Sequence, residues 1–194
     1  MPENGLAAKP VSKRRDENGR VRGLVERAQR GDRTALEELY LLHFDRIYSY
    51  LHMSVGSRHD AEDLTTQTFV KMLEAIGRFQ WRSVPFSAWL FRIAHNLAMD
   101  HFRASKRWQP EEEVPEPAHT EESSAEEQAL VSLGQTSMLE LIDRLSPEQR
   151  QVLTLKFVFR FSNGEAASIL GKTEGAVKSL QHRALASLQK HVTR

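Results

Sequence analysis

The sequence predicts an all-α fold: two small helical domains joined by an acidic, flexible linker, with a helix-turn-helix in the second domain. Three observations support this prediction. Apolar residues recur every three or four positions over most of the chain, and little of it alternates as strands do. Charges of one sign gather in separate segments. Near the carboxyl terminus two short helical patterns meet at Gly171, which suits a tight turn between crossed helices.

The charge distribution divides the 194 residues into parts. The whole chain has a net charge of only +1, but residues 1–30 carry +4, residues 31–108 carry +1, residues 109–128 carry −8 and residues 129–194 carry +4. We therefore expect four parts: a disordered basic tail over residues 1–22, an N-terminal domain over 23–108, an acidic linker over 109–129 and a C-terminal domain over 130–194.

The composition narrows the function. Without cysteine the chain has no disulfide framework and no thiolate metal site. Its 8 histidines are scattered without ligand spacing, and it has no glycine-rich phosphate loop and no nucleophile elbow. No apolar run is long enough to cross a bilayer, and no apolar signal core begins the chain. We therefore expect a cytoplasmic protein that lacks a metal, a cofactor, membrane insertion and enzymatic activity.

In the N-terminal domain, apolar spacing predicts three helical stretches. The first begins near Asp32, continues or restarts after Tyr40, and ends before Gly56. The second begins at Asp60, a good capping residue, and we expect it to bury Leu73 in the core. A loop and the third helix follow over residues 78–107, the helix beginning near residue 88.

The linker and the start of the C-terminal domain have clear local signals. Prolines and glutamates make residues 109–122 unsuitable for a packed element, so we expect the two domains to be separate folding units. A capping box at Ser124 predicts one helix. Ser146 predicts another, because Pro147 follows it directly and Gln149 lies three residues after it. Residues 153–161 have high β propensity, and we interpret them as a helix end that runs into a buried turn.

The segment around Gly171 predicts a helix-turn-helix. Ser162 and Glu165 form a capping box, and Thr173 can cap the second helix. The second helix has an apolar stripe, formed by Val177, Leu180, Ala184 and Leu188. A polar, basic face can donate to phosphates and base edges in a major groove: Lys178, Ser179, Gln181, His182 and Arg183. The alternative is an ordinary surface helix with a solvated basic side.

An acidic-polar ridge is expected at the start of the second helix of the N-terminal domain. It consists of Asp60, Glu62, Asp63 and Gln67. The helix dipole favours anions in a first turn, which explains the three acidic residues without any function. Gln67 needs a different explanation, because it lies one turn from Asp63 on the expected exposed side. Such a ridge could dock on a basic helix of a partner.

Aromatic and basic side chains alternate around the third helix. The preceding loop carries Phe79, Trp81 and Phe86, and the helix and its end carry Trp89, Arg92, Asn96, Arg103, Lys106 and Arg107. Single-stranded nucleic acid is bound by rings that stack on bases and by cations that hold the backbone. The alternative is that Trp89, Ile93 and Leu97 belong to the core, and the pattern alone leaves both interpretations open.

Together, these segments resemble the bacterial RNA polymerase sigma factors of the extracytoplasmic-function subgroup. Residues 60–71, DAEDLTTQTFVK, resemble the family's core-polymerase docking motif. Residues 89–107, WLFRIAHNLAMDHFRASKR, resemble its promoter-melting helix. Residues 146–190 resemble its promoter-reading domain. Three motifs in the family's order are more specific than any one of them.

The resemblance implies a role for each surface. Docking on core polymerase would use Asp60, Glu62, Asp63 and Gln67. The melted promoter would contact Trp81, Phe86, Trp89, Arg92, Asn96, Arg103, Lys106 and Arg107. Duplex DNA upstream would contact Thr173, Lys178, Ser179, Gln181, His182 and Arg183.

The resemblance also implies partners: core RNA polymerase, promoter DNA and an anti-sigma factor. The implied function is a transcription initiation factor that directs the polymerase to promoters and helps to melt them. A second hypothesis is a conventional helix-turn-helix regulator with an N-terminal sensing or interaction domain. It would have no reason to carry the docking ridge and the aromatic-basic helix together.

Overall fold

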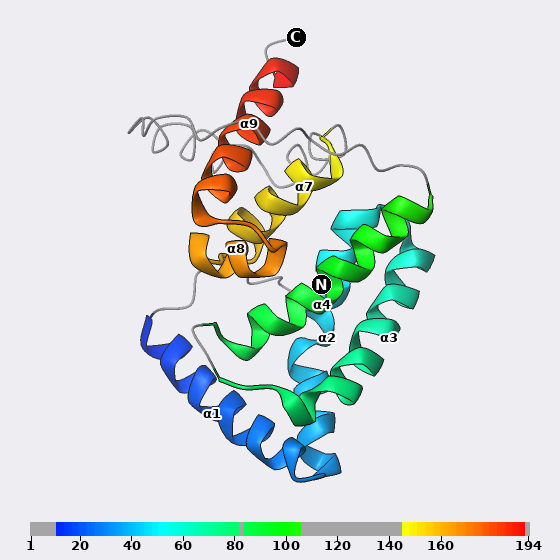
Figure 1. Ribbon diagram of the computed structural model, residues 1–194, viewed down its shortest axis with the longest axis vertical. Coiled ribbons are helices and arrows are strands. Elements are labelled where there is room, and N and C mark those ends of the chain that lie inside the picture. Colours follow the sequence, from blue (N-terminus) through cyan, green and yellow to red (C-terminus); the bar gives the residue numbers. More distant parts are fainter. Residues whose placement is uncertain (1–10, 82–83, 106–144, 193–194) are drawn as a thin grey trace, which may run out of the picture.

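The computed structural model of the chain describes residues 11–81, 84–105 and 145–192, and every regular element in these ranges is a helix (Figure 1). The predicted all-α fold is therefore confirmed. The predicted linker and the capping box at Ser124 lie outside the described residues, as do Lys106 and Arg107.

The N-terminal block consists of α1 (Val11–Gln29), α2 (Arg33–Val55), α3 (Arg58–Ala75), the 3-10 turn η1 (Ile76–Arg78) and α4 (Phe86–Ala104). As predicted, Asp32 caps α2, and its carboxylate accepts from the amides of the second and third helical residues. Gly56 ends α2 with a φ of 75°. The predicted cap of α3 was wrong: Ser57 accepts from the amide of Asp60, so Asp60 lies inside the first turn.

Helix α1 contradicts the expected disorder over residues 1–22, because residues 11–22 are helical. The second half of α1 presents an apolar stripe to the core: Val21, Leu24, Val25 and Ala28, all buried. This stripe holds the helix on α2. The residues before Val21 have no such apolar period. They continue the helix of the packed half, because they include good helix formers such as Lys and Arg.

Helix α2 is the centre of the N-terminal block, since it packs against α1, α3 and α4. It buries Leu39, Ile47, Tyr50 and Leu51 completely. The expected burial of Leu73 was wrong, because its exposed fraction is 51%. The buried side of α3 consists of Leu64, Thr65, Thr68, Phe69 and Met72, and Leu73 lies beyond its edge.

The C-terminal block consists of α7 (Pro147–Leu153), the π-helical segment η2 (Thr154–Val158), α8 (Asn163–Leu170) and α9 (Glu174–Val192). Ser146 caps α7 by accepting from the amide of Gln149. Ser162 and Glu165 form the predicted capping box, with distances of 3.2 and 2.7 Å. Gly171 has a φ of 65° between α8 and α9. The predicted helix-turn-helix is therefore confirmed.

The predicted buried turn after α7 is also present, and it joins the two blocks. Its aromatic rings Phe159 and Phe161 pack edge-on against Phe91 of α4, with centroid distances of 5.0 and 4.9 Å. The guanidinium of Arg46 lies 5.5–5.8 Å from the centroids of these three rings. The expectation of separate folding units was therefore wrong for the described residues, because the rings of the turn bury their surface against α4.

Candidate nucleic-acid and polymerase interface

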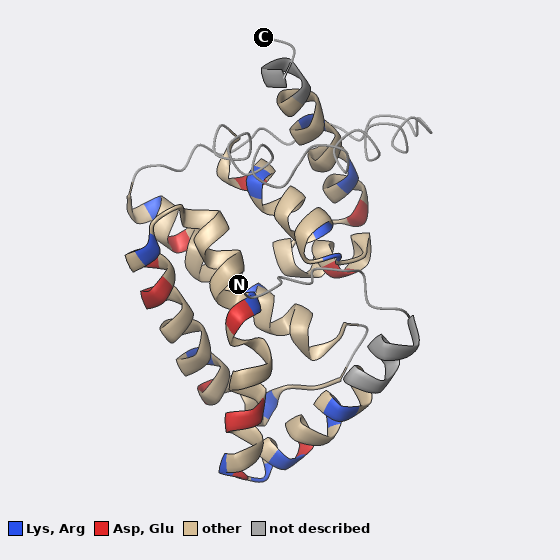
Figure 2. Cartoon of the chain, turned by 180° about the vertical axis from the view of Figure 1, so that it is seen from behind, with Lys and Arg blue, Asp and Glu red and all other residues tan. Residues whose placement is uncertain are grey.

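The acidic-polar ridge lies on α3, which carries red acidic segments in Figure 2. Glu62, Asp63 and Gln67 are exposed. Glu62 accepts a 2.9 Å bond from Arg58, and the carboxylate of Asp63 lies 3.7 Å from His59. Ion pairs this exposed to solvent are weak. Both carboxylates can therefore leave Arg58 and His59 to bind cations of another protein.

Asp60 differs from the rest of the ridge. Its side chain is only 33% exposed, and its carboxylate lies 3.6 Å from Nε2 of His101 on α4. This contact connects the start of α3 to the end of α4. Asp60 therefore has a structural partner within the chain, in addition to any partner outside it.

Exposed apolar side chains lie on the same two helices. They are Tyr40 and Leu41 on α2 and Val70 and Leu73 on α3, with exposed fractions from 40% to 66%. The ring of Tyr40 contacts that of Phe69, at a centroid distance of 4.7 Å, which places the two helices' apolar residues together. Val70 is one turn beyond Gln67, so the ridge continues into this apolar patch.

Four aromatic rings form a cluster where the loop enters α4: Phe79, Trp81, Phe86 and Trp89. The centroid distances to Phe79 are 5.2 Å from Trp81, 5.4 Å from Phe86 and 4.9 Å from Trp89. Trp81 and Trp89 are half-buried, but Phe86 is fully buried. The predicted contact of Phe86 with DNA is therefore contradicted. The buried ring of Phe86 packs against Trp89, with 5.3 Å between the ring centroids.

Two side chains of α1 hold this loop, and sequence reasoning missed both. The amide of Gln29 donates to the carbonyls of Ile76 and Phe79, at 3.0 and 2.8 Å. The guanidinium carbon of Arg22 lies 5.9 Å from the ring centroid of Trp81. No sequence signal connects positions about 50 residues apart, so only the tertiary structure shows the connection.

The outer face of α4 continues from the aromatic cluster. Arg92 and Asn96 are exposed one turn apart, and Trp89 and Ile93 are half-buried beside them. Arg103, near the end of the helix, pairs with Asp100 at 2.9 Å and is exposed. A stacking ring, an amide and guanidinium groups therefore occupy one side of a single helix. Leu97 is buried, as the core interpretation expects, and the single-strand interpretation stays a prediction.

The inner face of α4 contacts the C-terminal block. His95 is buried there, with Nδ1 3.3 Å from the hydroxyl of Tyr50. Burial lowers the pKa of His95 to about 4, although the neighbouring Gln151 opposes the shift. Burial also raises the pKa of Tyr50. His95 is therefore an uncharged part of the contact between the blocks near neutral pH.

The predicted DNA-reading face of α9 is only partly exposed. Lys178 and His182 are exposed one turn apart, and Arg183 is half-buried. Thr173 lies at the exposed start of the helix, where its hydroxyl accepts from the amide of Ala176. Ser179 and Gln181, by contrast, have exposed fractions of 7% and 6%. Gln181 lies four residues after Val177, so it belongs to the buried stripe.

The described part of the chain contains no group of three or more His, Asp or Glu side chains that could hold a metal ion. None of its helices combines the length and the apolar character needed to cross a membrane.

Comparisons with known proteins agree with this arrangement of surfaces. Residues 39–108 match the family "Sigma-70 region 2", and residues 135–188 match "Sigma-70, region 4". The chain is 41% identical over 174 residues to the ECF RNA polymerase sigma factor BldN of Streptomyces coelicolor. The aligned residues cover 89% of this chain and 66% of the relative. It is 32% identical over 179 residues to the ECF sigma factor SigD of Mycobacterium tuberculosis, covering 89% and 84%.

Solved structures show the same fold. CnrH, in a complex with the cytosolic domain of CnrY, superposes with a TM-score of 0.65 at 24% identity, covering 89% of this chain and 96% of that one. The two region matches, the relatives and the shared fold lead to one conclusion. The chain belongs to the extracytoplasmic-function RNA polymerase sigma factors, the initiation factors that direct core polymerase to promoters.

Proposed function

We propose that three separate surfaces of this sigma factor carry out docking, promoter melting and upstream recognition. The observation that supports this most strongly is the aromatic cluster at the start of α4. There Trp81 and Trp89 are half-exposed over buried rings, next to the exposed Arg92 and Asn96. Two partly exposed rings on the same surface as an exposed guanidinium and an exposed amide are what binding of a single strand requires.

Docking on core polymerase is assigned to the ridge of α3. Glu62, Asp63 and Gln67 would face basic groups of the polymerase, and Asp60 would contribute from the edge of the ridge. The apolar patch formed by Tyr40, Leu41, Val70 and Leu73 would extend the docking surface, because exposed apolar residues beside a charged ridge are typical of protein interfaces.

Melting is assigned to the outer face of α4. A base that leaves the duplex would stack on Trp89 or Trp81, and Asn96 would bond to its edge. Arg92 and Arg103 would hold the strand's phosphates, together with Lys106 and Arg107, which lie outside the described residues. Stacking contributes about 1–3 kcal/mol per base, which is comparable to the few kcal/mol that unstacking costs. Capture can therefore shift the balance towards the open promoter.

Recognition of duplex DNA upstream is assigned to α9. Lys178 and His182 are its exposed donors, and Thr173 and Arg183 lie beside them. Ser179 and Gln181 would reach DNA only if the groups that now cover them moved. The assignment divides the chain into domains over residues 23–108 and 130–194, with the acidic linker over 109–129 between them.

The remaining partners follow from the same assignment. The eight glutamates of residues 109–128 would lie on basic polymerase surface that nucleic acid otherwise occupies. An anti-sigma factor would cover the docking and DNA surfaces, as the anti-sigma factor NepR is named in a complex with the sigma factor RpoE of Bartonella quintana. The protein would act in the cytoplasm, and would contribute binding energy rather than a catalytic group.

Footprinting on one promoter separates melting from upstream recognition. The promoter is first selected by the wild-type holoenzyme. We expect Asn96→Ala to retain upstream DNase protection and to lose permanganate-reactive thymines, because only the open strand contacts Asn96. Lys178→Ala should weaken upstream protection instead, since a lost phosphate contact weakens duplex binding at any sequence. Normal opening by Asn96→Ala would refute the melting assignment.

A further inference from the structure

The arginines of α1 have no role in the assignment above. Helix α1 precedes residue 39, where the region 2 match begins, and it carries six basic and three acidic residues. Figure 1 shows it running beside the loop that leads from η1 to α4. The bonds from Gln29 to the carbonyls of Ile76 and Phe79 fix this arrangement. A basic helix therefore lies along the edge of the aromatic cluster.

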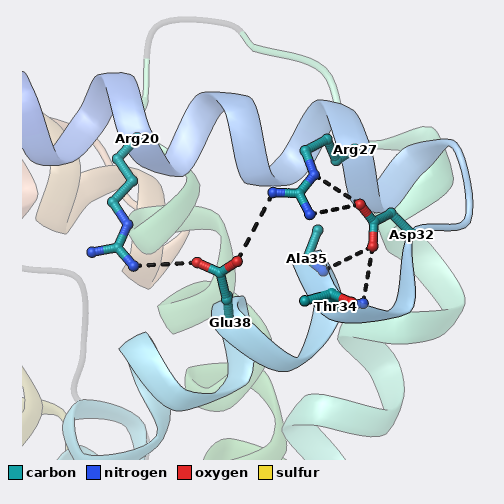
Figure 3. Close-up of polar contacts among 6 residues, drawn as sticks. All are labelled: Arg20, Arg27, Asp32, Thr34, Ala35 and Glu38. Atoms are coloured by element: carbon teal, nitrogen blue, oxygen red, sulfur yellow. Dashed lines mark hydrogen bonds and ion pairs between the residues drawn. The ribbon is translucent and has the colours of Figure 1, made fainter.

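Two of the three arginines in residues 18–29 have structural partners on α2 or at its start, as Figure 3 shows. Nη2 of Arg20 lies 3.2 Å from Glu38, and Arg27 binds the capping carboxylate of Asp32 at 2.7 Å. The bond from Arg27 also lowers the pKa of Asp32. These two arginines connect α1 to α2.

Arg22 is placed differently. Its guanidinium lies against the ring of Trp81 rather than on α2, and its side chain is 63% exposed. Its ion-pair partner, Glu26, is one turn along the same helix at 3.1 Å and is 48% exposed. An exposed ion pair within one helix is weak, so it does not prevent the guanidinium from binding an anion.

We propose that Arg22 binds the phosphate backbone of the melted DNA strand, so that α1 forms an outer wall of the single-strand site. A strand whose base stacks on the Trp81–Trp89 cluster must carry its phosphates past the rim of that cluster. Among the side chains of α1 that the structure describes, Arg22 is the cation in contact with that rim. An arginine beside an aromatic ring can hold a phosphate and at the same time support the ring that stacks on the base. This inference rests on the melting function proposed for α4.

Arg20 provides a matched control for the test. Both arginines lie on α1, both side chains are 63% exposed, and each makes one ion pair with a glutamate at 3.1–3.2 Å. Only Arg22 contacts Trp81. The substitutions Arg22→Ala and Arg20→Ala therefore remove the same charge from the same helix, at different distances from the aromatic cluster.

The experiment measures binding of single-stranded DNA by the reconstituted holoenzyme. The probe is a fluorescent 20-mer selected by the wild-type holoenzyme from a random single-stranded library, and the affinity is followed over a salt series. We expect Arg22→Ala to weaken binding several-fold at low salt. The slope of log affinity against log salt should become shallower by about 0.7, the value for one phosphate contact on a single strand. Arg20→Ala should keep the wild-type affinity and slope.

The other outcomes distinguish this inference from the proposed function. Wild-type binding by Arg22→Ala, with weakened binding by Asn96→Ala, would overturn the role of Arg22 and leave the melting surface in place. Wild-type binding by both variants would overturn the melting surface itself. Equal weakening by Arg22→Ala and Arg20→Ala would show a general charge effect of α1, and would also overturn the inference.

Discussion

At the scale of single residues, His95 shows how packing fixes a charge state. Its ring lies between the two blocks, in contact with Tyr50 and Gln151, and burial lowers its pKa to about 4. In the unfolded chain its pKa would be near 6.5. Above pH 6.5 the ring is neutral in both states, and its titration does not affect stability. Below that pH the unfolded chain binds the proton more readily, so stability falls until about pH 4.

This predicts a pH-dependent free energy of unfolding. Between pH 7 and pH 4, His95 should account for a loss of up to about 3 kcal/mol, from a pKa shift of between two and three units. His95→Gln should have a flatter profile than the wild type. Urea titrations at several pH values measure this. Parallel profiles for His95→Gln and the wild type would contradict the account.

The sequence predicted the exposed site residues better than the covered ones. Asp63 and Gln67 are exposed as their helical spacing suggested. Phe86 was misassigned, because both Phe86 and Trp89 are aromatic and the sequence does not show which of the two rings is buried. The same limit applies to Ser179 and Gln181, whose burial depends on the packing of α9 rather than on polarity.

At the scale of elements, the loop between η1 and α4 depends on a helix distant in sequence. Gln29 donates to two loop carbonyls, and we expect Gln29→Ala to release both, at a cost of about 1 kcal/mol for each bond lost. Hydrogen–deuterium exchange of the free protein should therefore be faster over residues 76–89. Asn18→Ala is the control, since it removes an exposed amide from the same helix. Unchanged exchange in Gln29→Ala would show that other contacts hold the loop.

Element boundaries were predictable where the signal is local. Asp32, Ser146 and Ser162 each cap the helix that follows, because a capping bond needs only neighbouring residues. The start of α1 was missed, since its first half lacks an apolar stripe and only its second half packs on α2. Composition alone therefore suggested a disordered tail where the structure has a helix.

At the scale of the whole molecule, α4 is shared between two surfaces. Its inner face, with Phe91 and His95, is covered by the C-terminal block, while its outer face leaves Arg92 and Asn96 exposed. The sequence showed an apolar stripe on this helix but not which element covers it. For that reason the two blocks were expected to be independent. Their packing leaves the proposed melting surface open and free of the C-terminal block.

The proposal that docking and melting use different surfaces is tested most directly by run-off transcription on two templates. One template is a fully paired promoter selected by the wild-type holoenzyme, and the other has the same sequence with a mismatched, pre-melted start region. Core polymerase alone gives the background on each. Asn96→Ala should transcribe poorly from the paired template and close to the wild type from the pre-melted one, because the mismatch supplies the opening. Asp63→Arg should stay near background on both, since the charge reversal prevents docking. A defect of Asn96→Ala that persists on the pre-melted template, or rescue of Asp63→Arg by it, would contradict the claim.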